Sequence, residues 1–98
     1  MRLRLVIRPE AADELRAAKR WYDAQRVGLG REMAAEVARA IAVAREDPER
    51  FPIVEGEIRR ALLHRFPYGV FFRARSHELV VVAVFHLHRD PATLQDRG

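Results

Sequence analysis

At 98 residues with a formal net charge of +4, the chain is expected to form a single domain that covers residues 1–98. It has no cysteine, which excludes a disulfide framework and a cysteine-based zinc site, and this fits a cytoplasmic protein. The start of the chain lacks the apolar stretch of a signal peptide, and no apolar run approaches the roughly 18 residues of a membrane span. We therefore expect no membrane association, and no sequence motif indicates a cofactor.

The basic residues are unevenly placed along the chain. Of 18 basic residues, 17 are arginine, and residues 1–50 balance 11 basic residues against 9 acidic ones. Residues 59–75 instead contain five arginines and no acid. Because arginine suits bidentate contacts to phosphates and carboxylates, this segment predicts a surface for a polyanion or an acidic protein partner.

The first elements are predicted from their apolar periodicity. Residues 2–8 alternate as a half-buried strand does, with Leu3, Leu5 and Ile7 on one face. A helix is predicted to start at Pro9, because proline is tolerated in a first helical turn. Its apolar positions recur at helical spacing, and we expect Trp21 to pack in the core beside them: Ala11, Leu15, Ala18 and Tyr22.

A second helix is predicted over residues 31–46. It follows a turn between Gly28 and Gly30, and the Asp47-Pro48 pair ends it because a residue before proline avoids the helical region. Its apolar face is expected to contain Met33, Val37, Ala40, Ile41 and Ala44. Residues 48–56 are predicted to be a loop whose Phe51 closes one edge of the core.

Three strands are predicted in the second half of the chain, over residues 57–63, 68–75 and 79–86. The last is apolar on both faces, which is typical of a central strand covered on both sides. Ser76-His77 is expected to form the hairpin turn before it. The order β-α-α-β-β-β predicts an α+β fold, in which a helical hairpin packs on a small, mostly antiparallel sheet.

Histidines at the end of the last strand are candidates for acid–base chemistry, because an unperturbed imidazole titrates near neutral pH. By strand alternation, His86 and His88 would share a face with Val82 and Val84. A histidine in this place is more often a hydrogen-bonded structural residue than a catalyst. Metal binding would need further ligands, and none stands at ligand spacing, so no metal site is expected.

These elements and their side chains resemble the RelE/ParE superfamily of toxins from bacterial toxin–antitoxin modules. The resemblance covers nearly the whole chain and depends on the order and spacing of several short blocks. In the first half they are the strand ending at Arg8-Pro9, the helix with Leu15 and Trp21-Tyr22, the Gly28–Gly30 turn, Asp47-Pro48 and Phe51-Pro52. In the second half they are Arg60, Leu63, Phe66-Pro67-Tyr68, Phe72 and the run from Val82 through His86 to Arg89-Asp90-Pro91.

The resemblance implies one of two activities. One branch resembles ribosome-dependent mRNA endonucleases, and the other resembles ParE-type inhibitors of DNA gyrase. A nuclease centre would use Arg60, Arg65, Arg73 and His86. In the nuclease branch a tyrosine or histidine in the C-terminal tail typically joins such groups, whereas the tail after Pro91 has no tyrosine, histidine or lysine, and no aromatic residue near Leu94.

The sequence therefore favours the gyrase-inhibitor branch, with mRNA cleavage and a non-toxic binding module on the same fold as alternatives. The resemblance also implies a cognate acidic antitoxin as partner in a hetero-oligomer and a role in growth arrest or plasmid stabilisation. The residues expected to bind target or antitoxin are cationic and lie in the second half of the chain: Arg59, Arg60, Arg65, Arg73, Arg75, His88 and Arg89.

Overall fold

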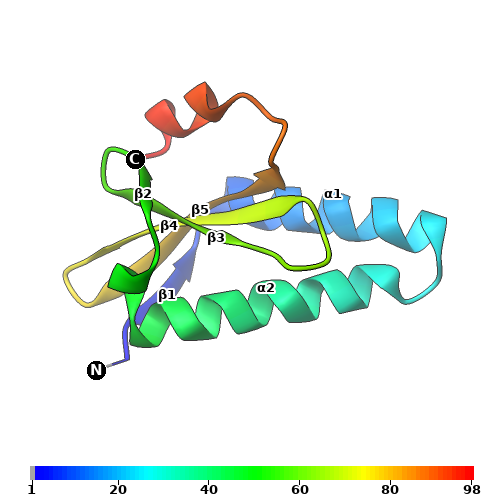
Figure 1. The fold of residues 1–98 in the computed structure, drawn as a ribbon, viewed down its shortest axis with the longest axis horizontal. Coiled ribbons are helices and arrows are strands. Elements are labelled where there is room, and N and C mark those ends of the chain that lie inside the picture. The colour runs from blue at the N-terminus through cyan, green and yellow to red at the C-terminus, as the bar shows by residue number, and fades with distance from the viewer. Residues whose placement is uncertain (1) are drawn as a thin grey trace.

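The computed structural model describes residues 2–98, which form two helices packed on a five-stranded sheet (Figure 1). The strand order is β1-β5-β4-β3-β2; β1 runs parallel to β5, and every other neighbouring pair is antiparallel. This is the α+β fold that the sequence predicts. The elements in chain order are β1 (Arg4–Ile7), α1 (Pro9–Gln25), α2 (Leu29–Glu46), the 3₁₀ turn η1 (Pro48–Arg50), β2 (Ile53–Glu55), β3 (Ile58–Leu62), β4 (Tyr68–Arg75), β5 (Glu78–His86) and the 3₁₀ segment η2 (Pro91–Asp96).

The helical hairpin is closed by the glycines that the sequence singled out. Gly28 has φ +89°, a left-handed conformation that glycine adopts without steric cost, and α2 begins directly after it. At Gly30 a Cβ atom would lie 2.5 Å from the carbonyl oxygen of Lys19, so only glycine allows this close approach of the helices. The Asp23 carboxylate accepts the Gly30 N–H at 2.8 Å and so ties α1 to the first turn of α2.

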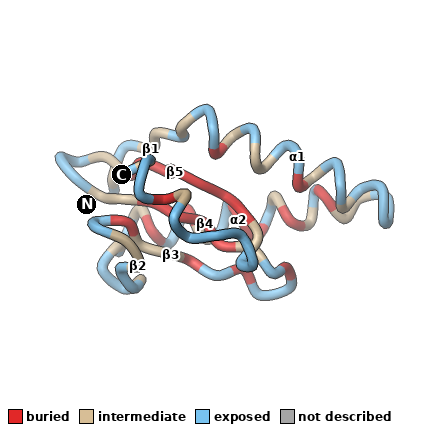
Figure 2. The backbone as a smooth tube through the Cα atoms, turned by 90° about the horizontal axis from the view of Figure 1, so that it is seen from above, coloured by how far each residue is buried: buried red, intermediate tan, exposed pale blue. Residues whose placement is uncertain are grey.

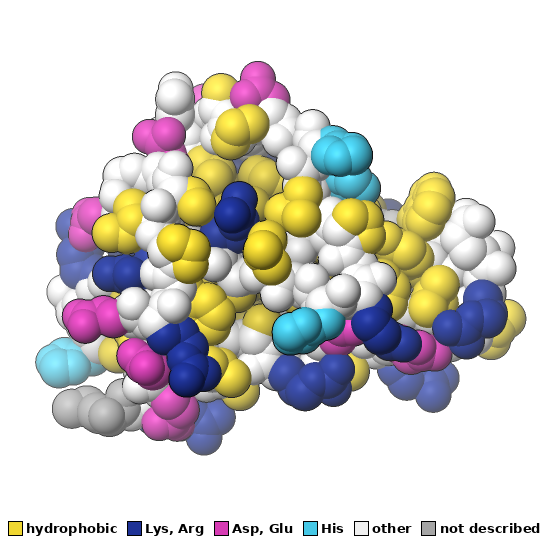
Figure 3. All heavy atoms as spheres, in the orientation of Figure 1, with side chains coloured by type: hydrophobic (Ala, Val, Ile, Leu, Met, Phe, Trp, Pro, Cys, Tyr) yellow, Lys and Arg dark blue, Asp and Glu magenta, His cyan; other side chains and the backbone are white. Residues whose placement is uncertain are grey.

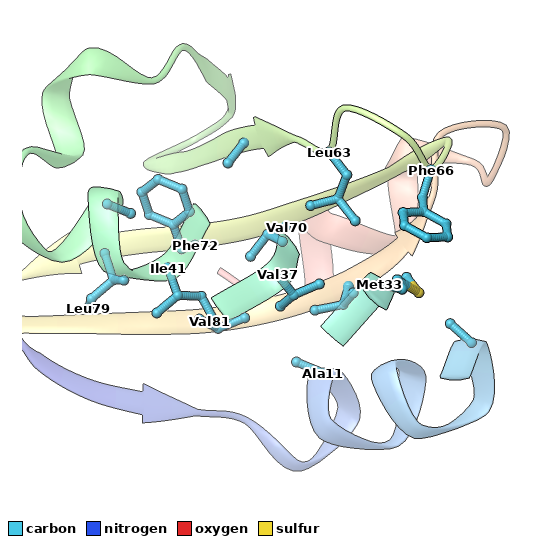
Figure 4. Close-up of a cluster of buried hydrophobic side chains, with 14 residues drawn as sticks. Ala11, Met33, Val37, Ile41, Leu63, Phe66, Val70, Phe72, Leu79 and Val81 are labelled. Carbon is cyan, nitrogen blue, oxygen red and sulfur yellow. The ribbon is translucent and has the colours of Figure 1, made fainter. Parts of the chain in front are cut away.

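The main core lies between the helices and the sheet (Figure 4). Met33, Val37 and Ile41 of α2 point toward Val70 and Phe72 of the sheet, as the helical periodicity predicted. The ring of Phe51 meets that of Phe72 edge-on at 5.5 Å, which confirms its predicted place at the core edge. Burial of such side chains supplies most of the favourable free energy of folding in a domain of this size.

A second apolar cluster covers the other face of the sheet. Phe71 and Phe85 pack with their ring centroids 4.6 Å apart, and η2 lays Leu94 against them. Every residue of β5 from Leu79 to Phe85 is buried, which confirms the prediction of a covered central strand. In Figure 2 the buried stretch runs along β5, whereas burial on α1 alternates with exposure.

A β-bulge in β5 overturns the predicted alternation at the end of the chain. Phe71 lies opposite Ala83 but Phe72 lies opposite Val81, so Val82 is an extra residue on β5. Val82 therefore joins the second cluster while Val84 joins the main core, and the two do not share a face. The strand also ends at His86, so His88 lies beyond it in a turn.

Three smaller expectations were also wrong. The predicted loop over residues 48–56 contains η1 and the short strand β2, because its apolar residues find a partner in β3. Ile7 is 45% exposed at the end of β1, whereas the partly buried Leu3 and Leu5 pack against the main core. Trp21 is 57% exposed instead of packed in the core, and its ring meets that of Tyr22 edge-on.

Candidate functional site

One arginine of the arginine-rich segment, Arg65, is neutralised by acids of α2. Arg65, which follows β3, donates from Nε to Glu36 Oε2 at 2.9 Å and from an Nη atom to Glu32 Oε1 at 2.9 Å. Both glutamates lie on α2, about thirty positions earlier in the chain, as the sequence separations of 29 and 33 residues show. Arg65 is therefore tied to α2 and presents little uncompensated charge to a partner.

Glu36 is the only buried charged residue among the described residues, at 6% exposure. One of its carboxylate oxygens accepts the backbone N–H of His64 at 2.9 Å and that of Arg65 at 3.3 Å. Burial by itself raises the pKa of Glu36, but the hydrogen bonds from the Arg65 guanidinium and the two backbone N–H groups outweigh it, so the net pKa is lowered. Glu36 thus holds the β3–β4 connection onto α2 as an ionised carboxylate.

Two more arginines of the segment make local contacts. Arg59 donates from Nη1 to the carbonyl oxygen of Phe51 at 2.7 Å, which fixes the chain around η1. Arg75 lies 3.8 Å from the Glu57 carboxylate in an exposed pair. Exposed pairs of this kind contribute little to stability.

Arg60 and Arg73 differ from the others, because neither side chain makes an ion pair or hydrogen bond within residues 2–98. The Nε atom of each is buried and has no partner. Arg60 is directly opposite Phe71, two residues from Arg73, so the two arginines are diagonal neighbours on the face away from the helices. Leaving a buried donor unsatisfied costs free energy, so this pair of arginines is a candidate binding site.

A small cavity of about 110 Å³ lies beside Arg60 on this face. In the view of Figure 3, hydrophobic side chains gather at the middle of the molecule with a basic side chain among them. Arg89 also borders the cavity, and its guanidinium lies 4.9 Å from the centroid of the Phe85 ring. The remaining lining is apolar: Val54, Phe71, Phe85, Leu87, Pro91 and Leu94.

The histidines lie on the opposite side of the sheet. The His86 ring packs edge-on against Tyr68 at 5.3 Å, and it borders a groove of about 340 Å³ that α1 lines with Ala18 and Trp21. His86 Nδ1 accepts the backbone N–H of His88 at 3.0 Å, so this nitrogen is committed to the turn. Burial raises the pKa of Tyr68, which keeps its hydroxyl protonated.

A second glutamate organises the C-terminal segment. Glu14 of α1 accepts the backbone N–H of Val84 at 3.0 Å, where β5 runs on beyond the end of β1. The same carboxylate accepts from Arg89 at 2.7 Å and from Arg97 at 2.9 Å. Glu14 thus replaces a missing strand partner and holds η2 across the second apolar face of the sheet.

The residues proposed for RNA cleavage therefore fall into three places. Arg60 and Arg73 lie together on the face away from the helices, His86 lies on the helix side, and Arg65 is bound to α2. Sequence reasoning missed Glu14 and Glu36, although each had a signal. Each acid stands three residues after one apolar-face residue of its helix and four before another, so it borders the buried stripe.

Residues 2–98 contain no group of three or more histidine, aspartate or glutamate side chains placed to hold a metal ion. None of the helices that the structure describes has the length and apolar character needed to cross a membrane. Neither a protein-family model nor a curated protein sequence matches the chain.

A solved structure does match in three dimensions. It is described as "Chromosomal ParDE TA system from P. aeruginosa", and the TM-score is 0.77 over 88% of this chain and 97% of that chain, at 16% sequence identity. The fold is like that of a chain in this ParDE structure. At this identity the likeness establishes the architecture alone; the strand register of this chain puts Arg60 and Arg73 on the sheet face that η2 partly covers.

Proposed function

We propose that the protein is the toxin of a type II toxin–antitoxin module, that it arrests growth by binding and inhibiting DNA gyrase, and that a cognate acidic antitoxin neutralises it. The fold supports the toxin–antitoxin part, since the matching structure is described as a ParDE TA system. The proposal further places the protein in the cytoplasm as a single domain that forms a hetero-oligomer with its antitoxin.

The observation that carries the choice of a binding activity is the composition of the face around Arg60. The cavity there is bordered by two arginines and six apolar residues, and no histidine, tyrosine, lysine or carboxylate lines it. RNA cleavage through the 2′-hydroxyl needs a base for its proton and an acid for the leaving oxygen. Arginine is effectively always protonated and supplies neither, whereas it suits contacts with a protein or phosphate surface.

Within this proposal the candidate cations take different roles. Arg60, Arg73 and Arg89 contact the target, because they border or lie near the same cavity face. Arg59 and Arg65 hold the chain around β3. The exposed His88 and Arg75 lie at opposite ends of the sheet, and we assign them to the rim of the target-binding surface.

A supercoiling assay with purified gyrase tests the target. Excess purified protein is expected to block supercoiling, and the double variant Arg60→Ala/Arg73→Ala is expected to lose at least about tenfold in potency. Arg16→Ala is the matched control, because Arg16 is an exposed arginine of α1 paired with Asp13. Full supercoiling at excess wild-type protein rejects gyrase as the target.

Induced expression in cells tests the two alternative activities, mRNA cleavage and non-toxic binding. Codon-associated cuts in mRNA after induced expression, mapped by primer extension, would establish the endonuclease alternative; intact mRNA during growth arrest rejects it. Normal growth on expression without any partner would identify a non-toxic binding module. Co-purification with a small acidic protein encoded beside this chain tests the antitoxin.

A further inference from the structure

The two arginines that line the cavity of about 110 Å³ on the face away from the helices differ in charge compensation. Arg89 donates to the Glu14 carboxylate at 2.7 Å, so its charge is neutralised. The side chain of Arg60 has neither an ion pair nor a hydrogen bond within residues 2–98. Because no acid lines the cavity, Arg60 gives it one uncompensated positive charge.

Gly69 of β4 lets the Arg60 side chain lie close against the sheet. A Cβ atom at Gly69 would lie 3.3 Å from the Cγ atom of Arg60 and 3.0 Å from two ring carbons of Phe71. Without that Cβ atom, the ring and the arginine stem pack over the glycine, and the Arg60 Nε atom is buried. Packing and not hydrogen bonding therefore fixes this side chain, and the outer N–H groups of its guanidinium stay available to a ligand.

The size and walls of the cavity define the chemical class of that ligand. Its volume equals that of roughly three to four water molecules, which is room for a carboxylate with one or two methylene groups. Apart from the two arginines, every lining residue is apolar and suits the methylene groups. A guanidinium can bind a carboxylate through two parallel hydrogen bonds. The end of an aspartate or glutamate side chain has this composition, whereas a nucleic-acid phosphate has no apolar stem for these walls.

The surroundings of the cavity indicate that a protein supplies the carboxylate. Leu87 lines the cavity and is 40% exposed. Leu62 lies two residues after Arg60, on the same face of β3, and is 53% exposed. A free small acid would leave both leucines in water, whereas a protein partner buries them around its acidic side chain. Arginine at the centre of an apolar contact is typical of the residues that dominate protein interfaces.

We propose that the Arg60 cavity binds one acidic side chain of the protein target, and that Leu62 and Leu87 form the apolar rim around it. Arg73 is a diagonal neighbour of Arg60 and adds a second positive charge without lining the cavity. The assignment of the acidic side chain to gyrase rests on the proposed function, whereas the chemistry of the cavity does not.

Propionate is a suitable probe, because it joins a carboxylate to a two-carbon apolar stem. At constant ionic strength, it should shift the NMR signals of the Arg60 Nε–H and the Leu87 amide with a Kd weaker than about 1 mM, as suits a fragment of a larger partner. The neutral isostere propionamide and inorganic phosphate should leave both signals unchanged. No response to propionate overturns the site, and an equal response to phosphate overturns the choice of a carboxylate. A Kd tighter than about 1 mM overturns the protein source in favour of a free small acid.

Four variants locate the site. Arg60→Met should abolish the propionate response of the Leu87 amide, and Arg73→Met should weaken binding less. Arg60→Lys keeps the charge but loses the paired donors, and Gly69→Ala pushes a Cβ atom against the arginine stem, so each should weaken propionate about tenfold. Arg16→Ala is the matched control on α1. Equal affinity in Arg60→Met and Arg16→Ala, with both folded by circular dichroism, rejects the cavity.

A second copy of this chain is the alternative occupant. Analytical ultracentrifugation is expected to find the free protein monomeric. A dimer that becomes a monomer in Arg60→Met would place an acidic residue of the second copy in the cavity and overturn the assignment to a target.

Supercoiling assays with gyrase are a separate measurement, so the two proposals can fail independently. Leu62→Ser changes the rim but not the cavity lining, and should weaken inhibition about fivefold while propionate binding stays unchanged. Ile7→Ser is the matched control, since Ile7 is 45% exposed on β1 at the opposite edge of the sheet. Unchanged inhibition in Arg60→Met overturns the contact of this cavity with gyrase. Absence of inhibition by the wild type, with propionate still bound, rejects gyrase alone.

Discussion

Glu36 and Glu14 occupy equivalent places on the two helices but hold different parts of the molecule. Each stands three residues after one apolar-face residue of its helix and four before another. Glu36 accepts two backbone N–H groups of the β3–β4 connection and one arginine side chain, and Glu14 accepts one backbone N–H of β5 and two arginine side chains. Glu36 is 6% exposed and fixes the connection between β3 and β4, whereas the side chain of Glu14 is 14% exposed and fixes η2.

The difference shows how to interpret an arginine-rich segment. Three of the seven arginines after residue 50 find their acids on helices far away in the sequence, namely Arg65, Arg89 and Arg97, so the number of arginines overstates the free positive charge. What remains uncompensated is the pair Arg60 and Arg73. We therefore expect substitutions of the two glutamates to affect stability, and substitutions of these two arginines to affect binding.

The largest effect is expected at Glu36. Glu36→Ala leaves the His64 and Arg65 N–H groups without their acceptor beside a buried site, and we expect it to lower the free energy of unfolding by about 3 kcal/mol. Urea denaturation monitored by circular dichroism measures this. Glu32→Ala is the control, because Glu32 binds the same arginine from a more exposed position. Equal losses in the two variants would show that burial of Glu36 has no special weight.

A smaller effect is expected at Glu14. Glu14→Ala removes the acceptor of one backbone N–H, while Arg89 and Arg97 can turn to water, so the loss should be about 1–2 kcal/mol. Hydrogen exchange over residues 91–97 should accelerate more than exchange over α2. Asp13→Ala, which affects only an exposed pair, is the control. Unchanged exchange in η2 would contradict the role of Glu14.

Much of this fold follows from local patterns in the sequence. The start of helix α1 at Pro9 was anticipated because proline acts on its own backbone, and α2 starts at Leu29, two residues before the predicted start at residue 31. The two-residue turn at Ser76 and His77 was also expected, and both residues take the positive φ that such hairpin turns require.

Features that depend on pairing between distant residues were not predictable in the same way. The bulge at Val82 lies in a run where every neighbour is apolar, so alternation gives no sign of the extra residue. The strand β2 is three residues long and has Pro52 before it and Gly56 after it, which is typical of a loop. The candidate site was visible as a count of arginines, but which of them stay unpaired depends on tertiary contacts with α1 and α2.

The pH dependence of stability should follow Glu36 next. Its pKa is lowered in the folded state below the usual 4.5, so its contribution is present above about pH 4.5 and is lost as the pH falls through the folded value. One proton gives a slope of at most about 1.4 kcal/mol per pH unit. Thermal unfolding between neutral and acidic pH measures it, and Glu36→Gln should flatten the acid limb. A parallel limb in Glu36→Gln would assign the dependence to other carboxylates.

The smallest effect on stability is expected at Arg60. Arg60→Met keeps an apolar stem beside Phe71 and removes a buried Nε–H that has no partner, so the free energy of unfolding should stay within about 0.5 kcal/mol of the wild type or rise. Arg65→Met is the matched control and should be less stable, because it leaves Glu36 without its guanidinium. If gyrase inhibition falls in Arg60→Met while stability holds, the unpaired arginine serves binding. If Arg60→Met loses as much stability as Arg65→Met, Arg60 is a structural residue and the contrast between paired and unpaired arginines fails.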